Sequence, residues 1–200
     1  MQSGGCTPVL NRSLFGVVRE AGDSKAFGEV YGAAHGIEGI LAGNLIPLSR
    51  TSDEEWNRIA DTPAAALGST RRKLRDEDVP VIFDALAKRN IPYWFIIGGN
   101  DSAETGHNLV LESKKAGYDL TVMNVPKTID NDLVLTDHCP GYGSAARFVA
   151  LATMGASRDA EAMGIASPIT IIEVMGRDAG WLAAAAALAK QEERDGPHFI

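Results

Sequence analysis

The sequence predicts an α/β protein in which helices cover both faces of a parallel sheet, a three-layer sandwich. Two runs that are rich in apolar residues, "IPYWFIIGG" (91–99) and "PITIIEVMG" (168–176), are typical of strands buried on both faces. Segments with apolar residues at helical spacing separate these runs. The length of 200 residues suits one domain or a little more.

Hydrophobic periodicity and helix boundary signals predict each element in order. In the first half we expect a helix at 7–21, a strand at 26–34, a short helix or loop at 36–43, a helix opening on capping residues at 51–60, a basic loop at 67–78 and an amphipathic helix at 78–90. In the second half we expect a strand at 91–99, a helix with a glycine stop at 102–117, a strand at 118–126, a long helix at 143–164, a strand at 168–176 and a helix at 178–190.

The charge and composition narrow the function classes. The net charge of -7 gives no basic field for nucleic acid or for an anionic membrane surface. No run reaches the roughly 18 to 20 apolar residues of a membrane helix, and residues 1–15 lack the pattern of a signal peptide. The two cysteines, Cys6 and Cys139, form neither a metal spacing nor a disulfide framework. We therefore expect a cytoplasmic protein that binds neither nucleic acid nor a membrane.

Four polar loops lie at positions where a strand ends or a helix begins, and three of them contain glycine. They are "SGGCTP" (3–8), "IIGGNDS" (96–102), "VPKTIDND" (125–132) and "VMGRDAG" (174–180). In a parallel sheet such loops lie on one rim, which is where ligands bind. Glycine permits a close backbone approach, and helix N-termini favour phosphate. One glycine pair is usually only a turn, but the four loops together predict a phosphate-handling site.

The stretch "NVPKTIDNDL" (124–133) carries the chemistry that phosphoryl transfer needs. Lys127 offers a compact positive charge for phosphate oxygens. Asp130 and Asp132 are both acceptors, and only one is needed as a general base. The alternative interpretation is a turn rich in Asn and Asp with a solvated lysine.

At this point the sequence resembles the phosphofructokinase family. "GGNDS", "PKTIDND" and "MGRDAGWLAAAAALA" resemble its three signature loops, "SGGCTPVLN" resembles its first phosphate loop, and "LGSTRR" resembles its basic phosphate-contact loop. The resemblance covers residues 2–200. ATP-dependent members usually have glycine at the positions held here by Asp101 and Lys127. These two residues, together with "TDHCPGYGSAARFVA" (136–150), resemble the pyrophosphate-dependent branch.

The resemblance implies the reaction and the roles of individual residues. Phosphate would pass reversibly from pyrophosphate to the 1-hydroxyl of fructose 6-phosphate, giving fructose 1,6-bisphosphate. Asp130 resembles the proton acceptor and Lys127 the lysine of the transition state. Magnesium is the implied cofactor, and Asn100 stands where the family usually has its metal-associated aspartate. The implied diphosphate contacts are Gly5, Arg71 and Asp101, and the implied sugar-phosphate contacts are Thr128, Ile129, Asp130, Met175, Gly176 and Arg177.

The resemblance also implies a domain organisation. Residues 1–200 would form the donor-phosphate-binding, catalytic α/β half of a two-domain subunit, incomplete at both ends, with the sugar-phosphate domain largely missing. The full-length form would be a homo-oligomer, a dimer or a tetramer, in glycolysis. Two alternatives stay open, an ATP-dependent 6-phosphofructokinase and a non-catalytic phosphate-binding fragment or subunit. A dinucleotide-dependent oxidoreductase is disfavoured because no G-x-G-x-x-G follows a strand.

Overall fold

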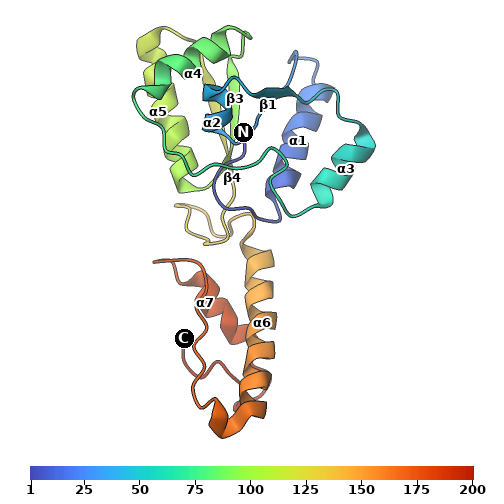
Figure 1. The fold of residues 1–200 in the computed structure, drawn as a ribbon, viewed down its shortest axis with the longest axis vertical. Coiled ribbons are helices and arrows are strands. Elements are labelled where there is room, and N and C mark those ends of the chain that lie inside the picture. The colour runs from blue at the N-terminus through green and yellow to red at the C-terminus, as the bar shows by residue number, and fades with distance from the viewer. The chain divides into compact units, whose positions relative to one another are not determined.

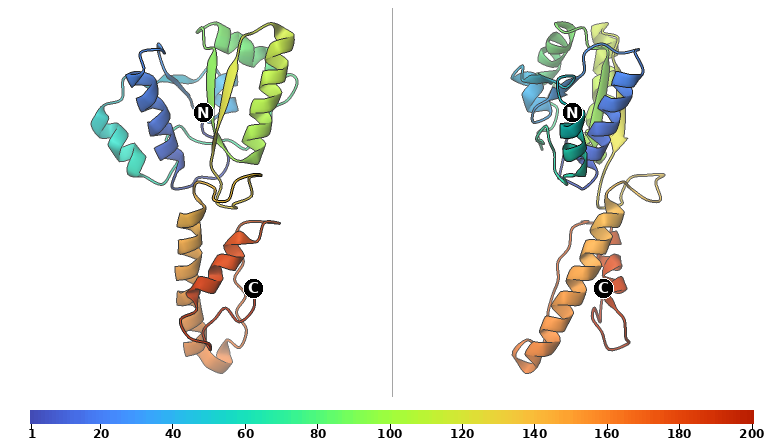
Figure 2. Two further views of the ribbon diagram at one scale, coloured as in Figure 1. Left: turned by 180° about the vertical axis from the view of Figure 1, so that it is seen from behind. Right: turned by 90° about the vertical axis from the view of Figure 1, so that its right-hand side faces the viewer.

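The structure, a computed structural model, describes residues 1–200 as two compact units. Unit 1 is Met1–Lys127 and unit 2 is Thr128–Ile200. Figures 1 and 2 show both. None of the helices has the length and apolar character required to cross a membrane.

The central sheet of unit 1 is parallel, as predicted. Strands β3 (Tyr93–Gly98) and β4 (Thr121–Pro126) pair along their whole length, with Tyr93 opposite Thr121 and Gly98 opposite Pro126. The connection between them is α5 (Asn100–Ala116), the helical crossover that parallel strands need. Gln2 adds a parallel bridge to Ile97. The strands expected at 91–99 and 118–126 and the helix expected at 102–117 are confirmed within a few residues.

Helices cover both faces of this sheet. Successive side chains of a strand point to opposite faces, so the two neighbouring isoleucines of β3 are buried on opposite sides. Ile96 of β3 is buried in a core with residues of α2, α4 and α5, whereas Ile97 is buried in a second core with residues of α1 and α3. The helices lie on either side of the two strands in Figure 2, and the three-layer arrangement is confirmed. Their bounds are α1 (Leu10–Asp23), α2 (Ile37–Leu41), α3 (Asp53–Asp61) and α4 (Asp78–Ala87).

A small antiparallel pair also belongs to unit 1. Strand β1 (Tyr31–Ala33) pairs with β2 (Leu45–Pro47), so that Gly32 lies opposite Ile46. The strand expected at 26–34 is therefore confirmed only over its last part, and β2 was not predicted. Each strand has three residues, which is too short for an alternating pattern to be recognised.

Unit 2 is built on one long helix, α6 (Tyr142–Met163), followed by the 3₁₀ turn η1 (Gly164–Ala166). A shorter helix, α7 (Trp181–Ala185), continues as the 3₁₀ helix η2 (Ala186–Ala189) and packs along α6. The two are drawn in orange and red in Figure 1. Their shared core contains Ala146, Val149, Leu182 and Ala185, so small side chains allow the two helices to approach closely. The helices expected at 143–164 and 178–190 are confirmed.

The strand expected at 168–176 is wrong. The segment has no strand assignment, and no backbone hydrogen bond joins residues 168–175 to another segment. Unit 2 contains no strand that could pair with it. Ile169 and Ile171 are consequently 80% and 89% exposed. The composition of a strand is present, but a strand forms only against a neighbour that accepts its hydrogen bonds.

Candidate functional site

Three of the four predicted loops meet in unit 1 at the carboxyl ends of the parallel strands. The amide of Ser3 donates to the carbonyl of Ile97 at 3.0 Å, and the amide of Lys127 donates to the carbonyl of Gly98 at 3.0 Å. The amide of Gly4 donates to the carbonyl of Thr70 at 3.1 Å. These bonds place the loop at 3–8, called the glycine loop below, next to the basic loop at 67–78 and the end of β4. Such a meeting of loops at one edge is what a parallel sheet predicts.

Two cationic side chains lie against the backbone of the glycine loop. A β-carbon built on Gly4 would be 3.2 Å from Nζ of Lys127, and one built on Gly5 would be 3.6 Å from Nη2 of Arg71. Gly4 has a φ of 81°, a conformation that glycine adopts without strain. Lys127 is only 6% exposed, whereas Arg71 lies at the surface. A lysine, an arginine and a tight backbone turn together form a site suited to phosphate oxygens.

Helix α5 begins beside this loop with Asn100 and Asp101. Gly98 precedes the helix, and a β-carbon there would lie 2.1 Å from Oγ of Ser102, so only glycine fits. Asp101 lies in the first turn, where the helix dipole favours a carboxylate.

The residues at the start of α5 are compatible with a magnesium ion that enters with a phosphate. No group of three or more His, Cys, Asp or Glu side chains is placed to hold a metal ion by itself. Asn100 and Asp101 offer one amide oxygen and one carboxylate. Magnesium commonly binds through one or two carboxylates together with substrate phosphates and water.

Unit 2 brings Asp130 and Arg177 together. Nη2 of Arg177 is 3.8 Å from Oδ2 of Asp130, which is a charge contact longer than a hydrogen bond. The Asp130 side chain is 15% exposed and that of Arg177 is 79% exposed. Gly176 and Arg177 both have positive φ, 121° and 43°, so the loop after residue 175 turns sharply at this point. A hydrogen-bond acceptor and an exposed cation therefore face one another.

The other predicted sugar-phosphate residues have different surroundings. Thr128 is buried, and its Oγ1 accepts from the amide of Asp130 at 3.1 Å. Ile129 packs against the core of unit 2, while Met175 is 64% exposed. Thr128 therefore supports the backbone of Asp130, and the assigned contacts of Ile129 and Met175 with a sugar phosphate stay predictions.

Asn131 is a residue of this loop that was not among the residues predicted to have a role. It is 7% exposed, it has a φ of 55°, and its side-chain amide hydrogen-bonds to the backbone at two points. The only sequence signal was an asparagine within an acidic loop, since asparagine tolerates the left-handed region better than most residues.

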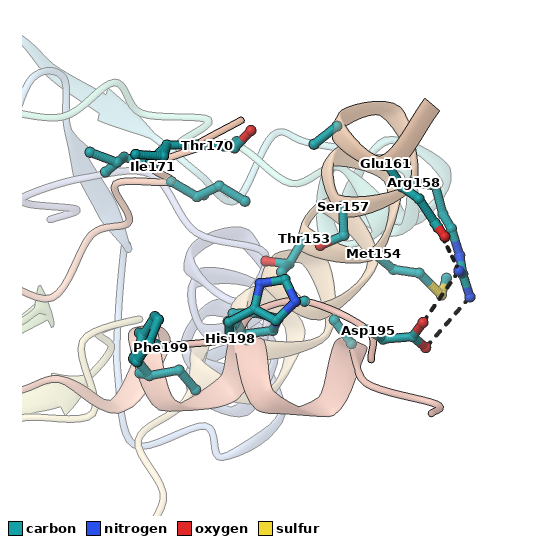
Figure 3. A pocket seen from close by; sticks show the side chains of 18 of the residues that line it. Thr153, Met154, Ser157, Arg158, Glu161, Thr170, Ile171, Asp195, His198 and Phe199 are labelled. Carbon is teal, nitrogen blue, oxygen red and sulfur yellow. Dashed lines mark hydrogen bonds and ion pairs between the residues drawn. The ribbon is translucent and has the colours of Figure 1, made fainter. Parts of the chain in front are cut away.

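A cavity of about 890 Å³ lies elsewhere in unit 2, along α6 and the segment 167–174. Figure 3 shows Arg158 of this cavity directed at Glu161 and Asp195. The distances are 3.1 Å to Glu161 and 3.3 Å to Asp195, and Arg194 is likewise paired with Glu192 at 3.2 Å. Backbone amides of Glu192 and Gln191 hold the pKa of Asp195 below its ordinary value. The arginines of this largely aliphatic cavity are therefore already paired, and the cavity does not resemble a phosphate site.

Comparisons with known proteins agree with the geometry. Residues 1–194 match the family described as Phosphofructokinase. A pyrophosphate–fructose 6-phosphate 1-phosphotransferase of Rhodospirillum rubrum is 45% identical over 199 residues, which are 100% of this chain and 48% of that protein. An ATP-dependent 6-phosphofructokinase of Actinobacillus pleuropneumoniae is 36% identical over 94% of this chain and 55% of that protein.

A solved structure is also similar to this chain over its whole length. The pyrophosphate-dependent phosphofructokinase of Marinobacter aquaeolei is 41% identical and superposes with a TM-score of 0.87, over 100% of this chain and 50% of that one. The chain thus spans about half the length of the relatives that it matches.

Proposed function

Because this chain belongs to the phosphofructokinase family, we propose that it provides the donor-phosphate and proton-acceptor half of a pyrophosphate-dependent phosphofructokinase. The observation that carries the proposal is the buried position of Lys127 against the glycine loop, with Asp101 in the first turn of α5. Lys127, at the end of β4, supplies a fixed positive charge for the short phosphate donor, pyrophosphate. Aspartate at the start of α5 supplies a negative side chain where a nucleotide's inner phosphate would need open space.

The proposed reaction divides between two groups of residues. Lys127 and Arg71, together with the backbone at Gly5, hold the phosphates of pyrophosphate and balance the charge that develops on transfer. Asp130 accepts the proton of the 1-hydroxyl of fructose 6-phosphate as that oxygen attacks phosphorus, while the bridging P–O bond of pyrophosphate breaks and orthophosphate leaves. Arg177, whose side chain reaches Asp130 from an exposed position, suits a contact with the anionic sugar phosphate.

Magnesium is the proposed cofactor, with Asn100 and Asp101 as the residues that would hold it together with the donor. When bound, a magnesium ion would neutralise part of the negative charge of the donor phosphates. Asn100 contributes a neutral oxygen, so most of the negative charge around the ion would come from pyrophosphate itself.

The proposed partners and location follow from the same assignment. Pyrophosphate and fructose 6-phosphate are the small-molecule substrates, and the full-length enzyme is proposed to be a cytoplasmic homo-oligomer, a dimer or a tetramer. The second half of the sugar-phosphate site is proposed to lie in the part of the relatives that this chain does not span.

The test is a donor assay in a chimera. Residues 1–200 replace the aligned half of the Rhodospirillum rubrum relative, and phosphorylation of fructose 6-phosphate is measured with pyrophosphate and with ATP. We expect turnover with pyrophosphate and little with ATP. Preference for ATP would instead support the ATP-dependent alternative, and a folded chimera that uses neither donor would support the non-catalytic one.

Two substitutions sharpen the assay. Asp101→Gly with Lys127→Gly should lower kcat/KM for pyrophosphate by about 100-fold, in the range that single charged contacts to a transferring group contribute. The matched control is Asp119→Gly with Lys25→Gly, at two exposed positions outside these loops. Equal pyrophosphate kinetics in the two double variants would remove Asp101 and Lys127 from the donor site.

A further inference from the structure

Asn131 follows Asp130 directly and has an unusual backbone. Its φ is 55°, in the left-handed region, and the residue is 7% exposed. Asparagine is one of the few residues besides glycine that adopts this region at modest cost. Burial of an amide also requires that its donor and acceptor both find partners.

Both ends of the Asn131 amide are bonded to one neighbouring stretch of backbone. Nδ2 donates to the carbonyl of Asp137 at 3.2 Å, and Oδ1 accepts from the amide of Cys139 at 2.7 Å. A backbone N–H can only donate and a carbonyl can only accept, so these partners allow one orientation of the amide. Cys139 itself is fully buried, which shields the shorter of the two bonds from water.

The segment that contains Asp130 is thus fastened on both sides. Before Asp130, the amide of Thr128 donates to the carbonyl of Pro140 at 3.1 Å, within a parallel bridge between Thr128 and Gly141. After Asp130, the two bonds of Asn131 tie the chain to residues 137 and 139. The amide of Asp130 is bonded to Oγ1 of Thr128 at 3.1 Å. The backbone on either side of the carboxylate therefore has little freedom to rotate.

We propose that Asn131 is a positioning residue that sets the direction of the Asp130 carboxylate for proton transfer. This inference rests on the proposed function. Removal of the amide releases the loop at 137–139, and the carboxylate then samples directions in which it does not reach the sugar hydroxyl. Aspartate at this position keeps the acceptor for Cys139 but turns an oxygen toward the carbonyl of Asp137. It also adds a negative charge beside Asp130, which favours the protonated form of the proton acceptor.

The experiment uses the active chimera described above with Asn131→Gly and Asn131→Asp. Glycine tolerates the backbone conformation but lacks both hydrogen bonds, and aspartate is nearly isosteric. Asn90 provides the matched control, because it also has a positive φ, 51°, but is exposed and has no side-chain hydrogen bond. Asn90→Gly and Asn90→Asp should leave the kinetics unchanged.

We expect Asn131→Gly to lower kcat by about 10- to 100-fold per folded molecule, with KM for fructose 6-phosphate little changed, since misdirection of a reacting group affects the transition state most. Asn131→Asp should move the acid limb of the pH profile of kcat to higher pH. Hydrogen exchange of the Cys139 amide should become faster in Asn131→Gly. A merely structural role would lower the folded fraction and leave kcat per folded molecule unchanged.

Two results would overturn the inference. One is an unchanged kcat in folded Asn131→Gly, and the other is an unchanged plateau kcat, at pH values above the acid limb, in Asn131→Asp, which loses the bond to the carbonyl of Asp137 but is close enough in shape to fold even if the glycine variant does not. Failure of the proposed function is a separate outcome, seen as an unsubstituted chimera that folds but transfers phosphate from no donor.

Discussion

Asp130 has 15% of its side chain exposed and an arginine 3.8 Å away, so the carboxylate is partly shielded yet open to a substrate. We expect Asp130→Asn in the chimera to lower kcat by about 100-fold or more, within the 10²–10⁴-fold that a general base contributes. KM for fructose 6-phosphate should change little. Steady-state kinetics with saturating pyrophosphate would measure both.

Asp132→Asn is the comparison that separates the two carboxylates of the loop, and Asp119→Asn, an exposed aspartate of unit 1, is the neutral control. If Asp132→Asn lost as much turnover as Asp130→Asn, or Asp130→Asn lost none, the proton would have to pass to another group.

The sequence predicted several residues of the site but not how their backbone is arranged. Gly5, Arg71 and Lys127 are brought together as expected, because the ends of neighbouring parallel strands must meet at one edge. Asn131 was not predicted to matter, because its role depends on a left-handed φ and on bonds to residues 137 and 139. Such bonds depend on how a loop folds back, which has no periodic pattern.

Asp78 is the first residue of α4, and its carboxylate ties the basic loop to the helix. It accepts from Nη2 of Arg72 at 2.7 Å and from the amide of Arg75 at 3.2 Å. The hydrogen bond from Arg72 is the main reason that the pKa of Asp78 is lowered in the folded chain. A lowered pKa stabilises the fold at pH values above about 4, the unfolded pKa, and the benefit is lost as the pH falls through the folded value.

We therefore expect Asp78→Asn to lower the urea midpoint of the chimera at pH 7 and pH 5, and the difference from the unsubstituted chimera to shrink at lower pH. Asp84→Asn is the control on the same helix. Its partner is Lys88, and both side chains are more than 60% exposed, so its effect should be much smaller at every pH. If Asp78→Asn lowered the urea midpoint by the same amount down to pH 2, the lowered pKa of Asp78 would not be the source of the stability.

Helices and strands were predictable to different degrees. The helices formed near their expected positions because an apolar stripe and its caps lie within one segment. Strand β3 formed because β4 follows it after one crossover helix. Residues 168–174 have an equally β-prone composition and remain unpaired, because a strand forms only where a neighbouring strand is available, whatever the composition of the residues.

At the scale of the whole chain, the exposed β-prone run in unit 2 is the main liability. Unpaired extended segments with exposed isoleucines act as templates for pairing with other chains. We expect the 200-residue chain alone to be inactive with pyrophosphate and fructose 6-phosphate, to self-associate, and to unfold without a single cooperative transition. Kinetic assays, light scattering and calorimetry would measure these three properties.

One substitution tests the cause of the association. Ile171→Lys places a charge at a position that is 89% exposed and should reduce scattering clearly. Val134→Lys is the control, at a loop residue that is 87% exposed outside the β-prone run. Equal effects of the two lysines would indicate that pairing of this particular run does not govern association. Robust turnover by the chain alone would show that the remaining half of the relatives is dispensable.

The contact between Gly4 and Lys127 constrains how this sequence can diverge. A β-carbon at position 4 would lie 3.2 Å from Nζ of Lys127, so the ammonium group would have to retreat by a few tenths of an ångström. A flexible side chain can make that shift at little cost in stability, yet the charge would leave its place. Position 4 should therefore covary with position 127 across the family. Asparagine, which tolerates the φ of 81° at position 4, should occur there among sequences with glycine at 127 and be rare among those with lysine.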